Sequence, residues 1–271
     1  MPATATTAPK SASVPRGRLM LNKVPEITLY FWIIKIMCTT VGETAADYVN
    51  GTLGFGLTNT TIVAGGLLVA LLVIQFRLKK YVPTVYWLAV VVISVFGTLI
   101  TDNLTDRYNV SLVTSTIVFT VILAAVFAGW YRSERTLSIH SIVTTRRESW
   151  YWLAILFTFA LGTAAGDLTG EKLALGYWWS VVLWAGLIAA ITVAHYRFKL
   201  NAVLAFWLAY ILTRPLGASI GDGLSQPDNQ GLNLGTTTTS YIFLACILVV
   251  VTFLSVTKRD QTPPELAAAS A

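Results

Sequence analysis

Four aspartates occupy equivalent places in an internal repeat, and carboxylates with regular spacing are suited to binding a cation. In each copy a tryptophan is followed ten residues later by a glycine and five residues after that by the aspartate. The four sets are Trp32, Gly42 and Asp47; Trp87, Gly97 and Asp102; Trp152, Gly162 and Asp167; and Trp207, Gly217 and Asp222. Carboxylate oxygens bind hard ions such as Mn²⁺, Mg²⁺ or Ca²⁺, and they also carry protons. The first hypothesis is therefore a cation site built from the four aspartates.

A structural interpretation of the same residues stays open. Each aspartate precedes a turn-like stretch such as "NLTDRYN", and its side chain could accept hydrogen bonds from backbone N–H groups there. Ionisable groups within membrane spans usually face a cavity or a pathway, which favours the site. The four glycines, each with a small residue four places later, form ridges that predict close helix packing. The tryptophans are predicted to mark a membrane interface, with packing between repeats as the alternative.

Three further charged residues fall in the same segments. Glu43 lies four residues before Asp47, on nearly the same helical face, and is predicted to contribute to the cation site. Lys35 and Arg214 would tune the charge of that site. The alternative is that Lys35 pairs with an acidic group and Arg214 with a neighbouring aspartate, which would neutralise buried charge. Carboxylates outnumber these two cations, and a net negative interior favours a bound cation.

Composition indicates the elements that position these residues. The chain has 271 residues, of which 55% are hydrophobic and 12% are charged, whereas about 25% are charged in an ordinary soluble domain. Backbone groups in lipid must be satisfied within a helix, and about 20 apolar residues cross the bilayer. The sequence thus predicts an all-α polytopic membrane bundle of eight transmembrane helices, with additional aromatic anchors at Trp130, Trp150, Trp178 and Trp179. The eight spans are 26–48, 61–78, 84–104, 111–130, 150–169, 177–195, 202–224 and 239–257.

Each repeat is a two-helix hairpin, and the four hairpins are predicted to form one membrane domain. Since every repeat has two spans, all four hairpins should point the same way. The expected boundaries are 23–83 for repeat 1, 84–144 for repeat 2, 145–201 for repeat 3 and 202–258 for repeat 4. A disordered N-terminal tail, 1–22, and a C-terminal tail, 259–271, are predicted on either side.

The repeated motif resembles a family of bacterial "membrane-anchored" proteins with four tandem two-helix repeats, whose function is unknown. The resemblance covers roughly residues 23 to 258. It implies an eight-helix bundle and supplies neither a substrate nor a reaction.

The basic residues predict an orientation. Of the 19 lysines and arginines, 15 lie in the two flanks or in the connections between repeats. Positively charged connections stay in the cytoplasm, so both termini are expected there in a multi-pass protein of the bacterial inner membrane. The lipid bilayer is the expected partner, and the net charge of +6 needs no nucleic acid to explain it.

Two functions remain open. The leading prediction is a transporter or permease for a small cation, with coupling to protons as one option. The alternative is a non-transporting anchor or regulator whose cytoplasmic loops, especially residues 131–149, bind a protein partner that the sequence does not name. An enzyme is not expected, since the two histidines, His140 and His195, fall in predicted connections and no phosphate-binding loop occurs. No cofactor is expected.

Overall fold

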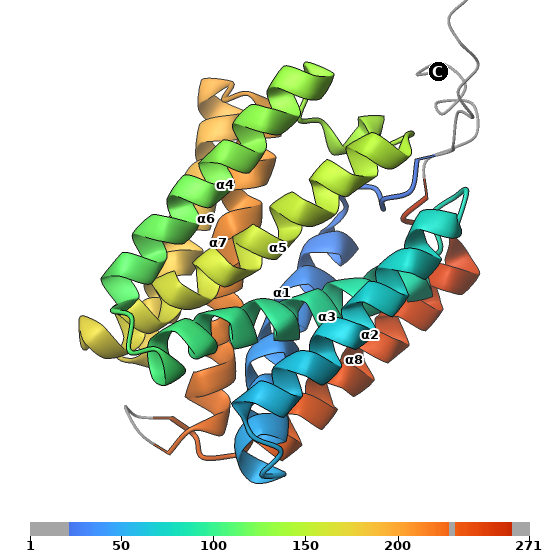
Figure 1. The fold of residues 1–271 in the computed structure, drawn as a ribbon. Helices are drawn as coiled ribbons and strands as arrows, with labels where there is room; N and C mark the ends of the chain where they lie inside the picture. The colour runs from blue at the N-terminus through green and yellow to red at the C-terminus, as the bar shows by residue number, and fades with distance from the viewer. Residues whose placement is uncertain (1–21, 228–230, 262–271) are drawn as a thin grey trace, which may run out of the picture.

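The computed structural model describes residues 22–227 and 231–261 (Figure 1). The predicted tails, 1–22 and 259–271, lie outside these residues except for Asn22 and positions 259–261.

Eight long α-helices make up the described chain, which contains no strand, and the all-α prediction is confirmed. Observed helix ends differ from the predicted ones by a few residues, because caps and fraying set the ends more than hydropathy does. The helices are α1 (Leu29–Asp47), α2 (Leu57–Arg77), α3 (Pro83–Asp102), α4 (Leu112–Glu134), α5 (Thr145–Asp167), α6 (Tyr177–Phe198), α7 (Ala202–Ser225) and α8 (Thr236–Thr257).

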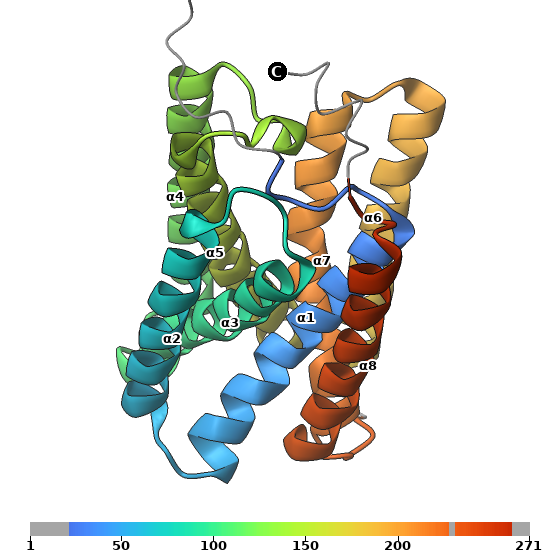
Figure 2. The ribbon, with the colours of Figure 1, turned by 90° about the vertical axis from the view of Figure 1, so that its right-hand side faces the viewer.

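The first helices of the four repeats form a closed inner ring. α1 contacts α3, α3 contacts α5, α5 contacts α7, and α7 contacts α1 (Figures 1 and 2). Each second helix packs mainly on the first helix of the next repeat, so that α2 lies on α3, α4 on α5, α6 on α7 and α8 on α1. The repeats therefore interlock, and the last one closes the ring onto the first.

The two ends of the bundle differ in connectivity and in charge. Figure 2 shows the connections between repeats at one end and the turns within hairpins at the other. We call the first the basic end, because the connections between repeats lie there together with both flanks, and these segments carry most of the lysines and arginines. The connections are residues 78–82, 135–144 and 199–201. We call the second the acidic end, because α1, α3 and α5 each finish there with an aspartate.

Seven of the eight described helices are long and apolar enough to cross a membrane. The exception is α1, which carries Lys35 and Glu43 as buried charges. α1 is also surrounded, since α3, α7 and α8 all pack against it. Its polarity is thus shielded by other helices, and the fold is compatible with a multi-pass membrane protein.

The repeat glycines lie where neighbouring helices of the inner ring come closest. A Cβ atom added at any of them would approach a side-chain atom of the next ring helix to less than 3.0 Å. The contact is always with the residue eight places before the next aspartate in the ring. The pairs are Gly42 with Ser94, Gly97 with Phe159, Gly162 with Arg214, and Gly217 with Thr39.

Replacing Gly97 with alanine should destabilise the bundle by about 1–3 kcal/mol, the usual range for overpacking. The new Cβ would lie 2.6 Å from the Cβ of Phe159. Gly186→Ala is the matched control, because this glycine of α6 has no atom within 4 Å of the added Cβ. Helix propensity alone would stabilise both variants. Unfolding titrations in detergent micelles measure the difference, and equal stability of the two variants would contradict close packing at Gly97.

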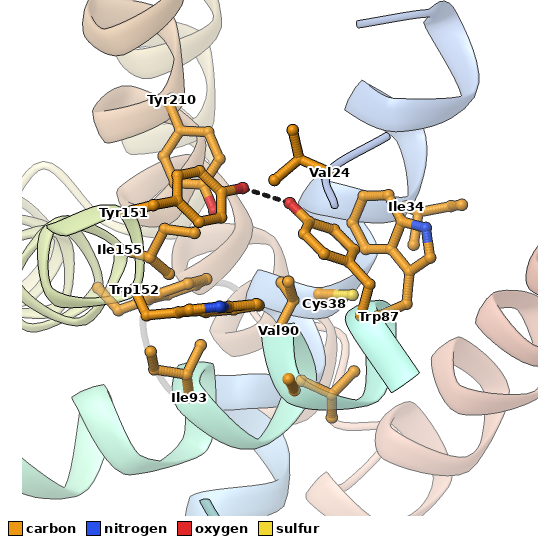
Figure 3. Close-up of a cluster of buried hydrophobic side chains, with 14 of the residues drawn as sticks. Val24, Ile34, Cys38, Trp87, Val90, Ile93, Tyr151, Trp152, Ile155 and Tyr210 are labelled. Carbon is orange, nitrogen blue, oxygen red and sulfur yellow. Dashed lines mark hydrogen bonds between the residues drawn. The ribbon is translucent and has the colours of Figure 1, made fainter. Parts of the chain in front are cut away.

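An aromatic cluster fills the bundle near the basic end (Figure 3). Trp87, Trp152 and Trp207 are buried, and Trp32 is half-buried. Packing between repeats, the alternative, therefore describes three of the repeat tryptophans better than an interfacial position does. The prediction that Trp130 is an interfacial anchor is wrong, since its ring is fully buried against Trp207 at 5.7 Å between centroids.

Candidate cation site at the acidic end

The four repeat aspartates line one cavity of about 340 Å³ at the acidic end. Asp47, Asp102, Asp167 and Asp222 are each half-buried there, and Glu43 lines the same cavity. The remaining lining comes largely from polar side chains in the adjoining turns or next to them, including Asn50, Thr105, Asp106, Tyr177 and Gln226. The ring thus brings together carboxylates that are about 55–65 residues apart in the sequence.

Three aspartates stand at one kind of junction. Asp47, Asp102 and Asp167 are the last residues of α1, α3 and α5, and each is followed by a π-helical turn, at Tyr48–Thr52, Asn103–Arg107 and Leu168–Lys172. Such turns occur frequently at functional sites. In the fourth repeat α7 instead continues for three residues beyond Asp222, and Pro215 lies inside this helix.

The capping interpretation finds no support at two of these junctions. Asp47 and Asp102 make no side-chain capping hydrogen bond to the turns that follow them. Asp47 instead accepts a hydrogen bond of 3.2 Å from the side-chain amide of Gln226, which reaches over from the end of α7. Both carboxylates line the cavity, and neither caps the turn that follows it.

Glu43, Asp47 and Asp222 form the tightest group in the cavity. One carboxylate oxygen from each lies within 4.8 Å of the others. Oxygen ligands of Ca²⁺ lie 2.3–2.6 Å from the ion, and those of Mg²⁺ lie closer, so oxygens on opposite sides of one ion can be about 4–5 Å apart. The three carboxylates fit the coordination sphere of a single hard cation. Asp102 and Asp167 line the same cavity outside this group.

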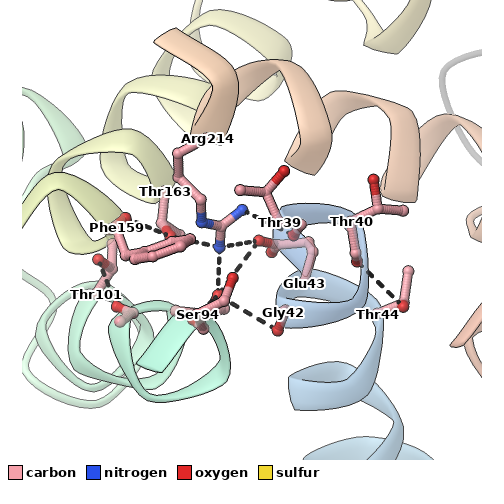
Figure 4. A network of polar contacts seen from close by, with 12 residues as sticks. Thr39, Thr40, Gly42, Glu43, Thr44, Ser94, Thr101, Phe159, Thr163 and Arg214 are labelled. Carbon is pink, nitrogen blue, oxygen red and sulfur yellow. Dashed lines mark hydrogen bonds and ion pairs between the residues drawn. The ribbon is translucent and has the colours of Figure 1, made fainter. Parts of the chain in front are cut away.

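Arg214 lies at the inner side of this site and joins all four ring helices (Figure 4). Its guanidinium is fully buried, and its Nη2 donates to Glu43 Oε2 at 2.7 Å. The same nitrogen donates to the hydroxyl of Thr163 at 2.7 Å and to that of Thr98. Arg214 is therefore paired, but the predicted partner, a neighbouring aspartate, is wrong. The partner is Glu43, which lies one turn before Asp47 on α1 and which packing of the ring helices brings level with Arg214.

Lys35 lies one turn further from the cavity than Arg214 and pairs with no carboxylate of the residues that the structure describes, so the predicted acidic partner is wrong. Its Nζ lies 4.2 Å from the centroid of the Phe159 ring and 4.1 Å from that of Tyr210. The side chain is buried, and Nζ has no hydrogen-bond partner among the described residues. Aromatic faces replace the expected ion pair, since cations are attracted to ring faces.

Sequence reasoning missed the groups that close the basic end. Lys23 forms a buried ion pair with Glu148, which also accepts a hydrogen bond of 3.1 Å from the side-chain amide of Gln75. The hydroxyls of Tyr86 on α3 and Tyr151 on α5 form a hydrogen bond between these neighbouring ring helices. Only the tyrosines stand at repeat-equivalent positions, so the repeat gave no signal for the ion pair.

A second contact at the basic end ties the C-terminal flank to a connection between repeats. Tyr81 donates a hydrogen bond of 2.6 Å to Asp260. Burial, followed by the nearby Asp260 carboxylate, raises the pKa of Tyr81 well above its ordinary value. The phenol therefore keeps its proton and remains the donor at neutral pH.

The fold and the cavity together define a helical-bundle protein of four interlocked repeats around an internal acidic site. Four segments, residues 30–81, 85–136, 150–201 and 205–260, match the family described as Repeat of Unknown Function (DUF347). The chain belongs to this family, which confirms the resemblance to proteins with four tandem repeats of unknown function. Neither a curated protein nor a solved structure matches the chain.

Proposed function

We propose that this protein is a membrane transporter or permease for a small cation, which it binds in the cavity at the acidic end. The proposal rests on the observation that all four repeat aspartates line this one cavity. Two of them, Asp47 and Asp222, lie close enough to Glu43 for the three carboxylates to bind a single ion. A rigid anchor would need no such convergence. Charged groups within membrane spans are costly to bury, and they commonly mark ion pathways.

The charge of the cavity supports a cation as the ligand. Its described lining includes six carboxylates and no lysine or arginine. Carboxylates that share a site repel one another when ionised, and a bound cation or bound protons relieve that repulsion. The carboxylates are Glu43, Asp47, Asp102, Asp106, Asp167 and Asp222.

The proposed orientation places the basic end and both termini in the cytoplasm, in accordance with the distribution of lysine and arginine. The acidic cavity then faces the opposite side of the membrane. Between the cavity and the basic end, the axis holds Arg214, Lys35 and the Tyr86–Tyr151 hydrogen bond. This arrangement corresponds to an alternating-access state that is open towards the outside and closed towards the cytoplasm.

Cation flux into proteoliposomes tests the proposal. The full chain should take up Mn²⁺ into vesicles that enclose a metal-sensitive dye. Asp47→Asn and Asp222→Asn should each slow the uptake by about tenfold or more, given one ionic ligand fewer. Asp102→Asn and Asp167→Asn remove negative charge from the same cavity without removing a ligand, and each should slow the uptake by a smaller factor. Unchanged uptake in all four variants would overturn the carboxylate site. Absence of flux in the unaltered protein would favour the alternative, an anchor or regulator that binds a partner at its cytoplasmic loops.

A further inference from the structure

We propose that Arg214 is a tethered competitor for the cation: it holds Glu43 while the cavity has no ion, and a divalent cation displaces it on binding. This inference rests on the proposed cation site and adds the class of ion and the means by which binding reaches the helix ring. It follows from the position of the Glu43 carboxylate, which contacts Arg214 on one side and lies close to the carboxylates of Asp47 and Asp222 on the other.

Glu43 belongs to the acidic group and to the arginine network at once. Its Oε2 accepts the 2.7 Å bond from Arg214. A carboxylate oxygen of Glu43 also lies within 4.8 Å of oxygens from Asp47 and Asp222. A cation bound by all three carboxylates would interact with the same negative charge on Glu43 that pairs with the guanidinium of Arg214. The two positive charges therefore compete for Glu43.

Two of the three guanidinium nitrogens of Arg214 are incompletely bonded. Its Nε is buried and has no hydrogen-bond partner among the described residues, and the bond from Nη1 to the Thr39 carbonyl is 3.5 Å long. A buried donor without a partner is unfavourable, so Arg214 has less to lose when it leaves Glu43.

Competition of this kind selects for charge. A monovalent ion at Glu43 would exchange one positive charge for another and lose the charge-assisted hydrogen bonds of the guanidinium. A divalent ion brings twice the charge and gains the carboxylates of Asp47 and Asp222. Since oxygen-only sites favour hard ions, the ligand class is a hard divalent cation.

Displacement of Arg214 would also change the contacts between helices of the inner ring. The same Nη2 atom binds the hydroxyls of Thr98 on α3 and Thr163 on α5, and thereby links both helices to α7. The stem of Arg214 packs directly against Gly162 of α5. A cation that frees the guanidinium therefore removes polar links among ring helices just inside the cavity.

A double-mutant cycle on Mn²⁺ binding tests the competition, with the full chain in nanodiscs and affinity measured by calorimetry. Arg214→Gln should tighten binding by about tenfold or more, which corresponds to about 1.4 kcal/mol. In a Glu43→Gln background the same change should alter affinity by less than about threefold, because no shared carboxylate remains. An equal tightening in both backgrounds would mean general repulsion and would overturn the proposal, as would unchanged affinity in Arg214→Gln.

Two further variants control for charge and for folding. Lys35→Met removes a buried axial charge that does not touch Glu43 and should change affinity by less than about threefold; a tenfold tightening would contradict specific competition. Arg214→Lys keeps the charge but loses the guanidinium fork, so it should still tighten binding if Arg214→Gln does not fold. Unchanged affinity in Arg214→Lys would overturn the inference.

The same measurements distinguish failure of the competition from failure of the proposed function. If the unaltered protein binds no Mn²⁺, the proposed function is overturned as well. If binding requires Asp47 but does not change when Arg214 is replaced, only the competition is overturned.

Discussion

Replacing Asp47 and Asp222 together with asparagine should weaken Mn²⁺ binding by about 100-fold or more, since each ionic ligand lost from a hard-ion site changes affinity by roughly an order of magnitude. These two residues and Glu43 are the carboxylates with oxygens within 4.8 Å of one another. Asparagine keeps the shape of the side chain and one carbonyl oxygen, so the loss reports charge rather than packing. Calorimetry on the full chain in nanodiscs measures it.

Asp106→Asn is the matched control for this prediction. Asp106 lines the same cavity but is exposed, and it lies in the π-helical turn Asn103–Arg107 outside the three-carboxylate group. Its charge is screened by solvent, so the substitution should weaken binding by no more than about threefold. Equal losses in Asp106→Asn and in the double variant would show that the cavity attracts cations only through its overall charge.

Replacing Lys23 with methionine should destabilise the bundle by about 3–5 kcal/mol, the usual result of leaving one partner of a buried ion pair alone. Lys23 and Glu148 are exposed by only 0% and 1%. The lysine precedes α1 and the glutamate lies in the first turn of α5, so the pair fastens the N-terminal flank across the basic end. Thermal unfolding in detergent micelles would show the loss.

The double variant Lys23→Met with Glu148→Met separates a lost ion pair from lost packing. It leaves no unpaired charge, and apolar replacements of a buried pair are often neutral or stabilising. It should therefore recover most of the stability that Lys23→Met loses. A double variant that is less stable than Lys23→Met would contradict an unpaired Glu148 as the cause.

The fold was largely predictable because its physical signals are local. Apolar runs of membrane length mark the helices, and one spacing of Trp, Gly and Asp in four copies marks the repeats. The order of contact was not predictable. Nothing in the spacing shows that α2 packs on α3 rather than on α1, or that α8 closes on α1. These contacts depend on which faces meet in three dimensions.

The candidate site was predictable in its residue types and only partly in its contacts. The spacing placed the four aspartates at equivalent positions of the repeat, but their convergence on one cavity follows from closure of the ring. For Arg214 the sequence favoured a neighbouring aspartate, whereas its partner is Glu43, which lies 171 residues away. Lys35 lies against the aromatic faces of Phe159 and Tyr210 and not against a carboxylate. These two residues come from other repeats, so the sequence near Lys35 does not indicate them. Long-range contacts of this kind leave no periodic trace in one sequence.

Anomalous diffraction from crystals of the full chain grown with Mn²⁺ would locate the cation on the protein. One strong peak is expected inside the acidic cavity, within about 2.0–2.6 Å of carboxylate oxygens of Glu43, Asp47 and Asp222, as hard-ion coordination requires. The peak should vanish in the Asp47→Asn, Asp222→Asn double variant. A cavity without a manganese peak at concentrations that saturate binding, with the ion elsewhere on the protein, would show that these carboxylates do not form the cation site.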